Sequence, residues 1–124
     1  MIVAGIGLRP GTGAAEIAAL VERAAHAAGC RPSVLAVPHF RRNEPGPGLA
    51  ARSLLLTITL VGQEALVAAQ PRCRTRSARA EAETGVAAVA EGCALAAAGP
   101  EAQLILLRIS SPNATCALAE SAAA

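Results

Sequence analysis

Charged residues in three segments of this chain could do chemistry, and the first of them is Arg9. It lies in a glycine-rich loop, GIGLRPGTG, at residues 5–13. The backbone N–H groups of such a loop, next to the start of a helix, form an anion-binding site. The Arg9 guanidinium could add a charge-assisted hydrogen bond to the same anion. This loop contributes three candidate ligand-binding glycines: Gly5, Gly7 and Gly11.

The second segment is an apolar stretch, VAAVAEGCALAAA at residues 86–98, with Glu91 as its one charged residue. Apolar residues recur at helical spacing on all sides, which is typical of a buried helix. An ionised carboxylate buried there without partners would be costly or would shift its pKa. Glu91 therefore either lies at a wet helix edge, bonded to water, or faces a partner or ligand as a site residue.

The third segment, PHFRRNEPGPG at residues 38–48, follows a predicted strand and is expected to be a long loop. Ligands of open α/β sheets bind beyond the carboxyl ends of the strands, so this loop is a good functional candidate. It carries Glu44, a candidate catalytic carboxylate. It also carries His39, which is either a loop histidine bonded to water or a general base.

The basic residues of the chain are all arginine and the acidic ones all glutamate. This bias is either compositional drift or a supply of planar guanidinium groups suited to binding carboxylates or phosphates. Four arginines fall within residues 72–79, where the simplest interpretation is a solvated charged segment; residues 72–77 form either an edge strand or a mobile loop. A net charge of +2 and a single aromatic residue do not favour nucleic-acid binding.

Several classes of site are disfavoured by what the sequence lacks. Pro10 stands where a dinucleotide-binding loop would have its third glycine, and the absence of lysine excludes a P-loop. The four cysteines are widely spaced without a CxxC pair, so neither a metal site nor a cofactor is expected. No export signal and no uninterrupted apolar run of about 18 residues is present, which predicts a cytoplasmic protein without a membrane partner.

Alternating helices and buried strands predict an α/β fold in one domain, residues 1–124. We expect a three-layer α/β/α sandwich with a mixed, largely parallel sheet of about five strands. The strands are predicted at 1–8, 33–37, 54–61, 103–109 and 114–119, and the helices at 14–28, 63–69 and 86–98, with a helical turn at 49–53. The apolar strand at 54–61 is expected at the centre of the sheet and the last strand antiparallel. Thr84 is the predicted N-cap of the third helix, and the tail after Ala119 is expected to fray.

Four stretches taken together resemble the cobalamin-biosynthesis family of CobE and the C-terminal domain of CbiG. They are GIGLRPG (5–11), NEPG (43–46), TGVAAVAEGCALAAAG (84–99) and LLRISSPNATCALA (106–119). The resemblance implies a small cytoplasmic α/β/α domain that acts in corrin-ring assembly. CbiG-type proteins of this family open a lactone on a cobalt-precorrin and release a two-carbon fragment, whereas the CobE type belongs to the oxygen-dependent route.

The resemblance also implies site residues. The positions that match the family pattern are Gly5, Gly7, Arg9, Glu44, Thr84, Gly85, Glu91 and Thr115. With Gly11, Val86 and Arg108 they form the candidate ligand-binding set, and Glu44 and Glu91 are the catalytic candidates. The sequence departs from the family at Leu8, at Pro10, at the Pro38-His39 pair and at Arg108, where a lysine is usual.

These residues support three functions. The first is binding or carriage of a precorrin or corrin intermediate, alone or in assistance of another cobalamin-pathway enzyme. The second is hydrolysis of a precorrin lactone with a glutamate as general base, and the third is a structural role in a biosynthetic complex. The first two require the glycine loop and the start of the alanine-rich helix to converge on one arginine-assisted pocket.

Overall fold

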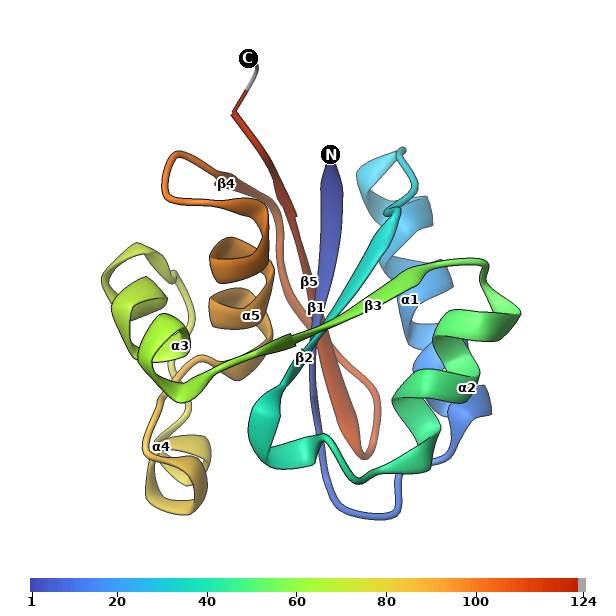
Figure 1. The fold of residues 1–124 in the computed structure, drawn as a ribbon, viewed down its shortest axis with the longest axis horizontal. Coiled ribbons are helices and arrows are strands. Elements are labelled where there is room, and N and C mark those ends of the chain that lie inside the picture. Colours follow the sequence, from blue (N-terminus) through green and yellow to red (C-terminus); the bar gives the residue numbers. More distant parts are fainter. Residues whose placement is uncertain (123–124) are drawn as a thin grey trace.

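Residues 1–122, the part of the chain that the computed structural model describes, form one sheet between two layers of helices (Figure 1). The strands are β1 (Ile2–Leu8), β2 (Val34–Pro38), β3 (Thr57–Val61), β4 (Gln103–Ser110) and β5 (Ala114–Glu120). The helices are α1 (Ala14–Ala28), α2 (Pro45–Ser53), α3 (Gln63–Ala69), α4 (Ala78–Thr84) and α5 (Val89–Ala98), with 3-10 turns η1 (His39–Arg41) and η2 (Gln70–Arg72). This arrangement confirms the predicted fold class.

The strand order is β3-β2-β1-β5-β4. The first three strands pair in parallel, while β5 is antiparallel to both β1 and β4, as predicted for the last strand. The central position expected for β3 is wrong, because β3 is an edge strand on which Ile58 and Leu60 are exposed. Leu54 and Leu56 pack against the core before β3 begins at Thr57. Part of the apolar stretch at 54–61 therefore anchors the turn after α2 and does not belong to the strand.

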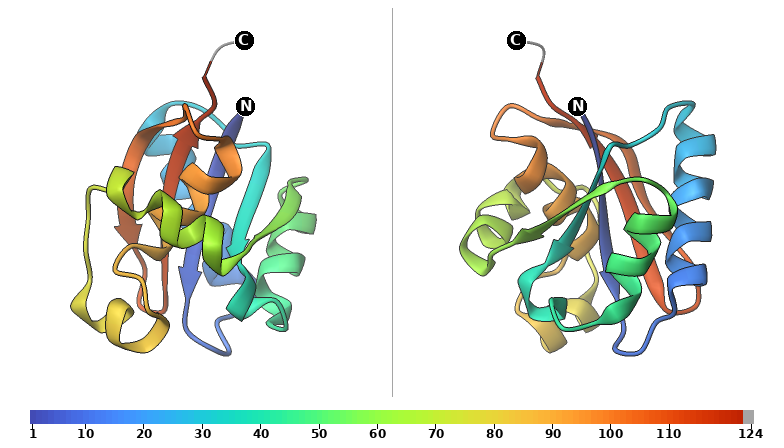
Figure 2. Two further views of the ribbon diagram at one scale, coloured as in Figure 1. Left: turned by 60° about the vertical axis from the view of Figure 1, so that its left-hand side comes forward. Right: turned by 45° about the vertical axis from the view of Figure 1, so that its right-hand side comes forward.

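Two hydrophobic layers enclose the sheet. One lies under α1 and α2 and includes Ile6, Ile17 and Leu35; the other lies under α3 and α5 and includes Val3 and Leu66. The two helix pairs cover opposite faces in every view (Figure 2). Within residues 1–122, no helix combines the length and the apolar content needed to cross a bilayer.

Three local predictions need correction. The segment expected as a loop at 38–48 is largely helical, because η1 occupies its start and Pro45 begins α2. Thr84 is not an N-cap: it ends α4, its hydroxyl donates to the Ala80 carbonyl at 2.7 Å, and α5 starts only at Val89. The tail is fixed as far as Ser121, which donates from its N–H to the Met1 carbonyl at 2.9 Å. The rest of the predicted frayed segment includes residues 123–124, which lie outside the described part.

Small residues let α5 lie directly on the sheet. A Cβ atom added to Gly5 in β1 would stand 2.1 Å from the Ala90 carbonyl oxygen and 2.4 Å from the Ala94 nitrogen. On the other side of α5, a Cβ at Gly92 would stand 2.6 Å from a methyl carbon of Leu66. Because these neighbours include backbone atoms that cannot rotate away, the α5–sheet contact requires glycine.

Gly5→Ala is expected to destabilise the fold by about 1–3 kcal/mol or more, because α5 must move away from β1 to admit the methyl group. Chemical denaturation measures the free energy of unfolding. Gly13→Ala is the matched control, since a Cβ there meets no atom within 4 Å and its φ is −75°. Equal stability of the two variants would contradict the close-contact argument.

Candidate functional site

A cavity of about 270 Å³ opens at the end of the sheet where β1, β2 and β4 finish. The loop after β1, the turn η1, the helix α4, the first residue of α5 and the β4–β5 turn all contribute to its lining. Gly7 and Val89 both line it, so the glycine loop and the start of the alanine-rich helix meet at one cavity. A Cβ at Gly7 would lie 2.7 Å from the Thr115 hydroxyl, which shows how closely the cavity floor is packed.

Four arginines line this cavity, together with a single carboxylate. The arginines are Arg9, Arg41, Arg79 and Arg108, and the carboxylate is Glu83. Serine, threonine and asparagine side chains of α4, the β4–β5 turn and β5 add hydrogen-bonding groups. A cavity with this excess of guanidinium groups suits a ligand that carries carboxylates. Within residues 1–122, no three metal-ligating side chains are grouped to hold an ion.

Arg41 is fixed by its neighbours. Its Nε donates to the Leu8 carbonyl at 2.8 Å, and its guanidinium carbon lies 5.1 Å from the centre of the Phe40 ring. A cation over an aromatic face is stabilised by the ring quadrupole. The terminal nitrogens of Arg41, a lining residue, have no hydrogen-bond partner among the described residues.

The glycine loop is folded onto the β4–β5 turn. Arg9 donates its N–H to the Asn113 carbonyl at 2.9 Å, and the buried Thr12 hydroxyl donates to the Arg9 carbonyl at 2.6 Å. Glu44 accepts the Gly11 N–H at 2.7 Å, so this carboxylate braces the loop from the α2 side. Arg9 itself is exposed, with its side chain at the cavity rim.

Glu16 in the first turn of α1 holds the β4–β5 turn in place. Its carboxylate accepts the Ser111 hydroxyl at 2.5 Å, the Asn113 N–H at 2.7 Å and the Asn113 side-chain amide at 3.0 Å. The bond from Ser111, followed by those from Asn113, lowers the pKa of Glu16 below its ordinary value. The β4–β5 turn that lines the cavity is therefore tied to α1, which covers the sheet face opposite α5.

Glu91 is 1 % exposed and lies behind the cavity wall. Its Oε1 accepts the N–H groups of Arg74 (2.7 Å) and Thr75 (2.9 Å), and its Oε2 accepts the N–H of Arg108 (3.0 Å). Burial raises the pKa of Glu91, but the three backbone N–H bonds, that of Arg108 foremost, outweigh it and hold the pKa below its ordinary value. The expected partners are thus main-chain donors, and the alternative of a wet helix edge is wrong.

The segment between α3 and α5 is tethered at two more points. The Gln70 side chain donates to the Ala88 carbonyl and accepts the Ala88 N–H, at 2.9 and 3.0 Å. The Ser77 N–H donates to the Ala87 carbonyl at 2.8 Å, which closes the base of the loop that carries α4. No residue of α4 is buried, so these tethers and Glu91 hold the helix beside the cavity.

The structure brings together five of the residues proposed from the sequence. Those that line the cavity are Gly7, Arg9, Thr84, Arg108 and Thr115. The others lie elsewhere: Gly5 under α5, Gly11 in the glycine loop, Glu44 at the start of α2, Gly85 at the end of α4 with φ +84°, Val86 in the core, and Glu91 behind the wall. His39 does not line the cavity either; its Nε2 lies 3.2 Å from the Gln63 side-chain oxygen.

Sequence reasoning missed Phe40, Arg41, Arg79 and Glu83 as lining residues. The first two lie in the segment 38–48, which the rule that ligands bind beyond strand ends does select, although that rule does not single out these two side chains. The other two lie in α4, which has no apolar stripe and overlaps the end of the arginine-rich residues 72–79, for which a solvated segment is the simplest interpretation.

Comparison with known proteins identifies the family to which the fold corresponds. The family model for the cobalamin synthesis G C-terminus matches residues 2–119. Protein CobE of Sinorhizobium sp is 38% identical over 121 residues, which are 95% of this chain and 79% of that protein. The crystal structure of CobE, a protein from the cobalamin (vitamin B12) biosynthetic pathway, superposes with a TM-score of 0.89 at 35% identity, covering 96% of this chain and 89% of that one.

A second solved structure, the cobalamin biosynthesis protein chiG from Agrobacterium tumefaciens str. C58, gives a TM-score of 0.81 at 33% identity. It covers 99% of this chain and 100% of that one. The fold and the cavity define a three-layer α/β/α domain with an arginine-lined pocket at the carboxyl end of its sheet. The chain belongs to the family of the CbiG C-terminal domain and CobE, and thus to cobalamin biosynthesis.

Glu91→Gln is expected to lower the free energy of unfolding by about 1–3 kcal/mol, because the new amide NH₂ must face one of three backbone donors. Chemical denaturation measures that loss, and hydrogen exchange should show faster exchange at the amides of Arg74, Thr75 and Arg108. The exposed Glu101→Gln serves as the control. Unchanged protection of those three amides would contradict the bracing role.

Stability is also expected to fall in acid. The pKa of Glu91 is lowered from 4.5 in the folded chain, so its contribution is present above pH 4.5 and is lost as the pH falls through the lowered pKa. Denaturation midpoints measured from pH 6 to about pH 3 should show a shallower decline for Glu91→Gln than for the unaltered chain. Parallel declines would mean that folding does not lower the pKa of Glu91.

Proposed function

We propose that the arginine-lined cavity binds the acidic edge of a precorrin or corrin intermediate and that the protein carries this ring without changing it. The observation that carries the proposal is the convergence of Arg9, Arg41, Arg79 and Arg108 on one cavity with a single carboxylate. Corrin precursors bear acetate and propionate side chains around a flat ring. Guanidinium groups recognise such carboxylates through paired N–H donors.

The size of the cavity supports a grip on one edge of the ring. Pockets that enclose a drug-sized ligand span ~300–1,000 Å³, and this cavity measures about 270 Å³. A tetrapyrrole is larger than such a ligand, so only its carboxylate-bearing side chains enter. The remaining face of the ring stays accessible, and a pathway enzyme could take the ring from there.

The contacts of Glu44 and Glu91, the two candidate catalytic carboxylates, support carriage of the ring rather than its hydrolysis. The Glu44 oxygen Oε1 is bonded to the Gly11 N–H, and both oxygens of Glu91 are bonded to backbone N–H donors. Neither carboxylate lines the cavity, which removes both from the position that a general base would need. Lactone hydrolysis remains a second candidate because Glu83 does line the cavity.

The two functions differ in what happens to the ligand. Purified protein is mixed with a precorrin, and the visible spectrum and the product mass are followed together. A shifted spectrum with unchanged mass supports carriage, whereas a changed mass with turnover supports hydrolysis. No spectral change until a partner enzyme is added would support the structural role.

Arg108→Gln and Arg9→Gln are each expected to weaken binding of uroporphyrin, a tetrapyrrole with acetate and propionate groups, by about 1–3 kcal/mol. Absorbance titration measures the affinity, and added salt should weaken binding by the unaltered protein. Arg52→Gln is the control because Arg52 is exposed at the end of α2, outside the cavity. An equal loss in the control, or no loss at Arg108, would reject the cavity as the site.

A further inference from the structure

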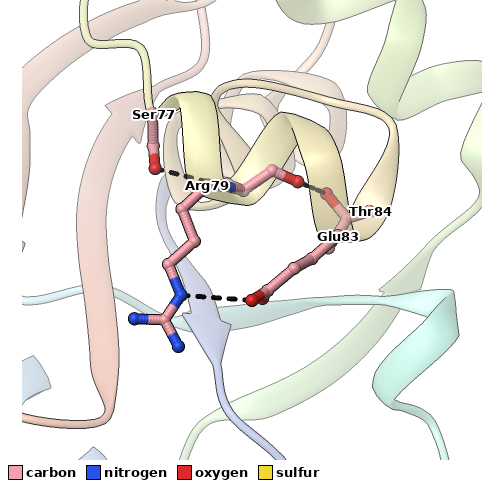
Figure 3. A network of polar contacts seen from close by, with 5 residues as sticks. Ser77, Arg79, Glu83 and Thr84 are labelled. Carbon is pink, nitrogen blue, oxygen red and sulfur yellow. Dashed lines mark hydrogen bonds and ion pairs between the residues drawn. The ribbon is translucent and has the colours of Figure 1, made fainter.

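Among the described residues that line the cavity, Glu83 is the one carboxylate beside four arginines, and it is paired with an arginine of the same helix. The Arg79 Nε lies 3.1 Å from Glu83 Oε1, one helical turn away. Both side chains leave the same side of α4 and meet beside it (Figure 3). The terminal nitrogens of Arg79 are not used in this pair.

The pair is weak enough to be replaced. Arg79 and Glu83 are 65% and 55% exposed, and exposed pairs at this helical spacing contribute little because water competes for both partners. A ligand carboxylate that meets Arg79 inside the cavity would be held by further arginines as well. The ligand would therefore compete favourably with Glu83 for the same guanidinium.

We propose that Arg79 exchanges Glu83 for a ligand carboxylate, which makes Arg79 a binding residue and Glu83 a specificity-determining one. The inference rests on the proposed function, since it assumes that an acidic ring occupies this cavity. Glu83 lowers the affinity for every acidic ligand. It thereby favours rings with enough carboxylates to engage the other arginines too, and it eases their release.

The construction of α4 allows this exchange without a change of fold. The Ser77 hydroxyl accepts the Ala80 N–H at 3.1 Å at the start of the helix, and the Thr84 hydroxyl donates to the Ala80 carbonyl at its end (Figure 3). These bonds fix the helix independently of the ion pair. Because α4 buries no residue, Arg79 and Glu83 can be substituted with little effect on the core.

The test compares uroporphyrin binding by the unaltered protein, Glu83→Gln, Arg79→Gln and the double variant. Glu83→Gln is expected to bind about two- to fivefold more tightly, in line with the small strength of an exposed pair. Arg79→Gln is expected to bind about tenfold more weakly. The gain from Glu83→Gln should vanish in the Arg79→Gln background, since the exchange needs the guanidinium.

The control is Glu22→Gln, which breaks another exposed ion pair, with Arg31, away from the cavity. It should leave the affinity unchanged. A gain from Glu83→Gln that persists in the Arg79→Gln background would overturn the exchange, because Glu83 would then act only by repelling the ligand carboxylates. Unchanged affinity in both single variants, with loss in Arg108→Gln, would overturn this inference alone; no binding by the unaltered protein would overturn the proposed function.

Discussion

The buried carboxylate of Glu91 is the constraint on which the shape of the cavity depends. Its three bonds join the segment after η2 to β4, whose outer edge has no neighbouring strand within residues 1–122. A buried carboxylate with three N–H donors is stable as an anion, whereas one without them would not be. The segment held in this way leads directly into α4, so Glu91 acts on the cavity without lining it.

The close contact between α5 and β1 is what places that carboxylate. Gly5 allows the helix backbone to touch the strand, and Gly92 allows the α3 side of the helix to approach equally closely. With larger residues at these positions, α5 would stand farther from the sheet and its carboxylate would not reach the Arg108 N–H. The shortage of large side chains in this chain is therefore compatible with a well-packed core, because contacts between backbones take the place of packed aromatic side chains.

Much of the fold could be predicted from the sequence, because most core elements are apolar stretches with a glycine or proline close to their ends. The need of Glu91 for partners could be predicted too, since burial of a charge follows from its neighbours alone. The identity of these partners as main-chain N–H groups could not be predicted, because backbone donors have no signature in the sequence. The exposed edge position of Leu60 and the helical state of Arg79 were missed for a related reason: both depend on tertiary position rather than local pattern.

The cavity walls come from segments far apart in the chain, each held by a polar side chain that does not face the ligand. Glu16 fixes the β4–β5 turn, Glu44 fixes the glycine loop, and Gln70 fixes the start of α5. Because these side chains satisfy backbone donors, the walls are held without acids at most of the lining arginines; among the described residues, only Arg79 of these four is paired with a carboxylate, that of Glu83. A cavity built this way keeps most of its positive charge uncompensated, which suits the proposed carriage of acidic rings.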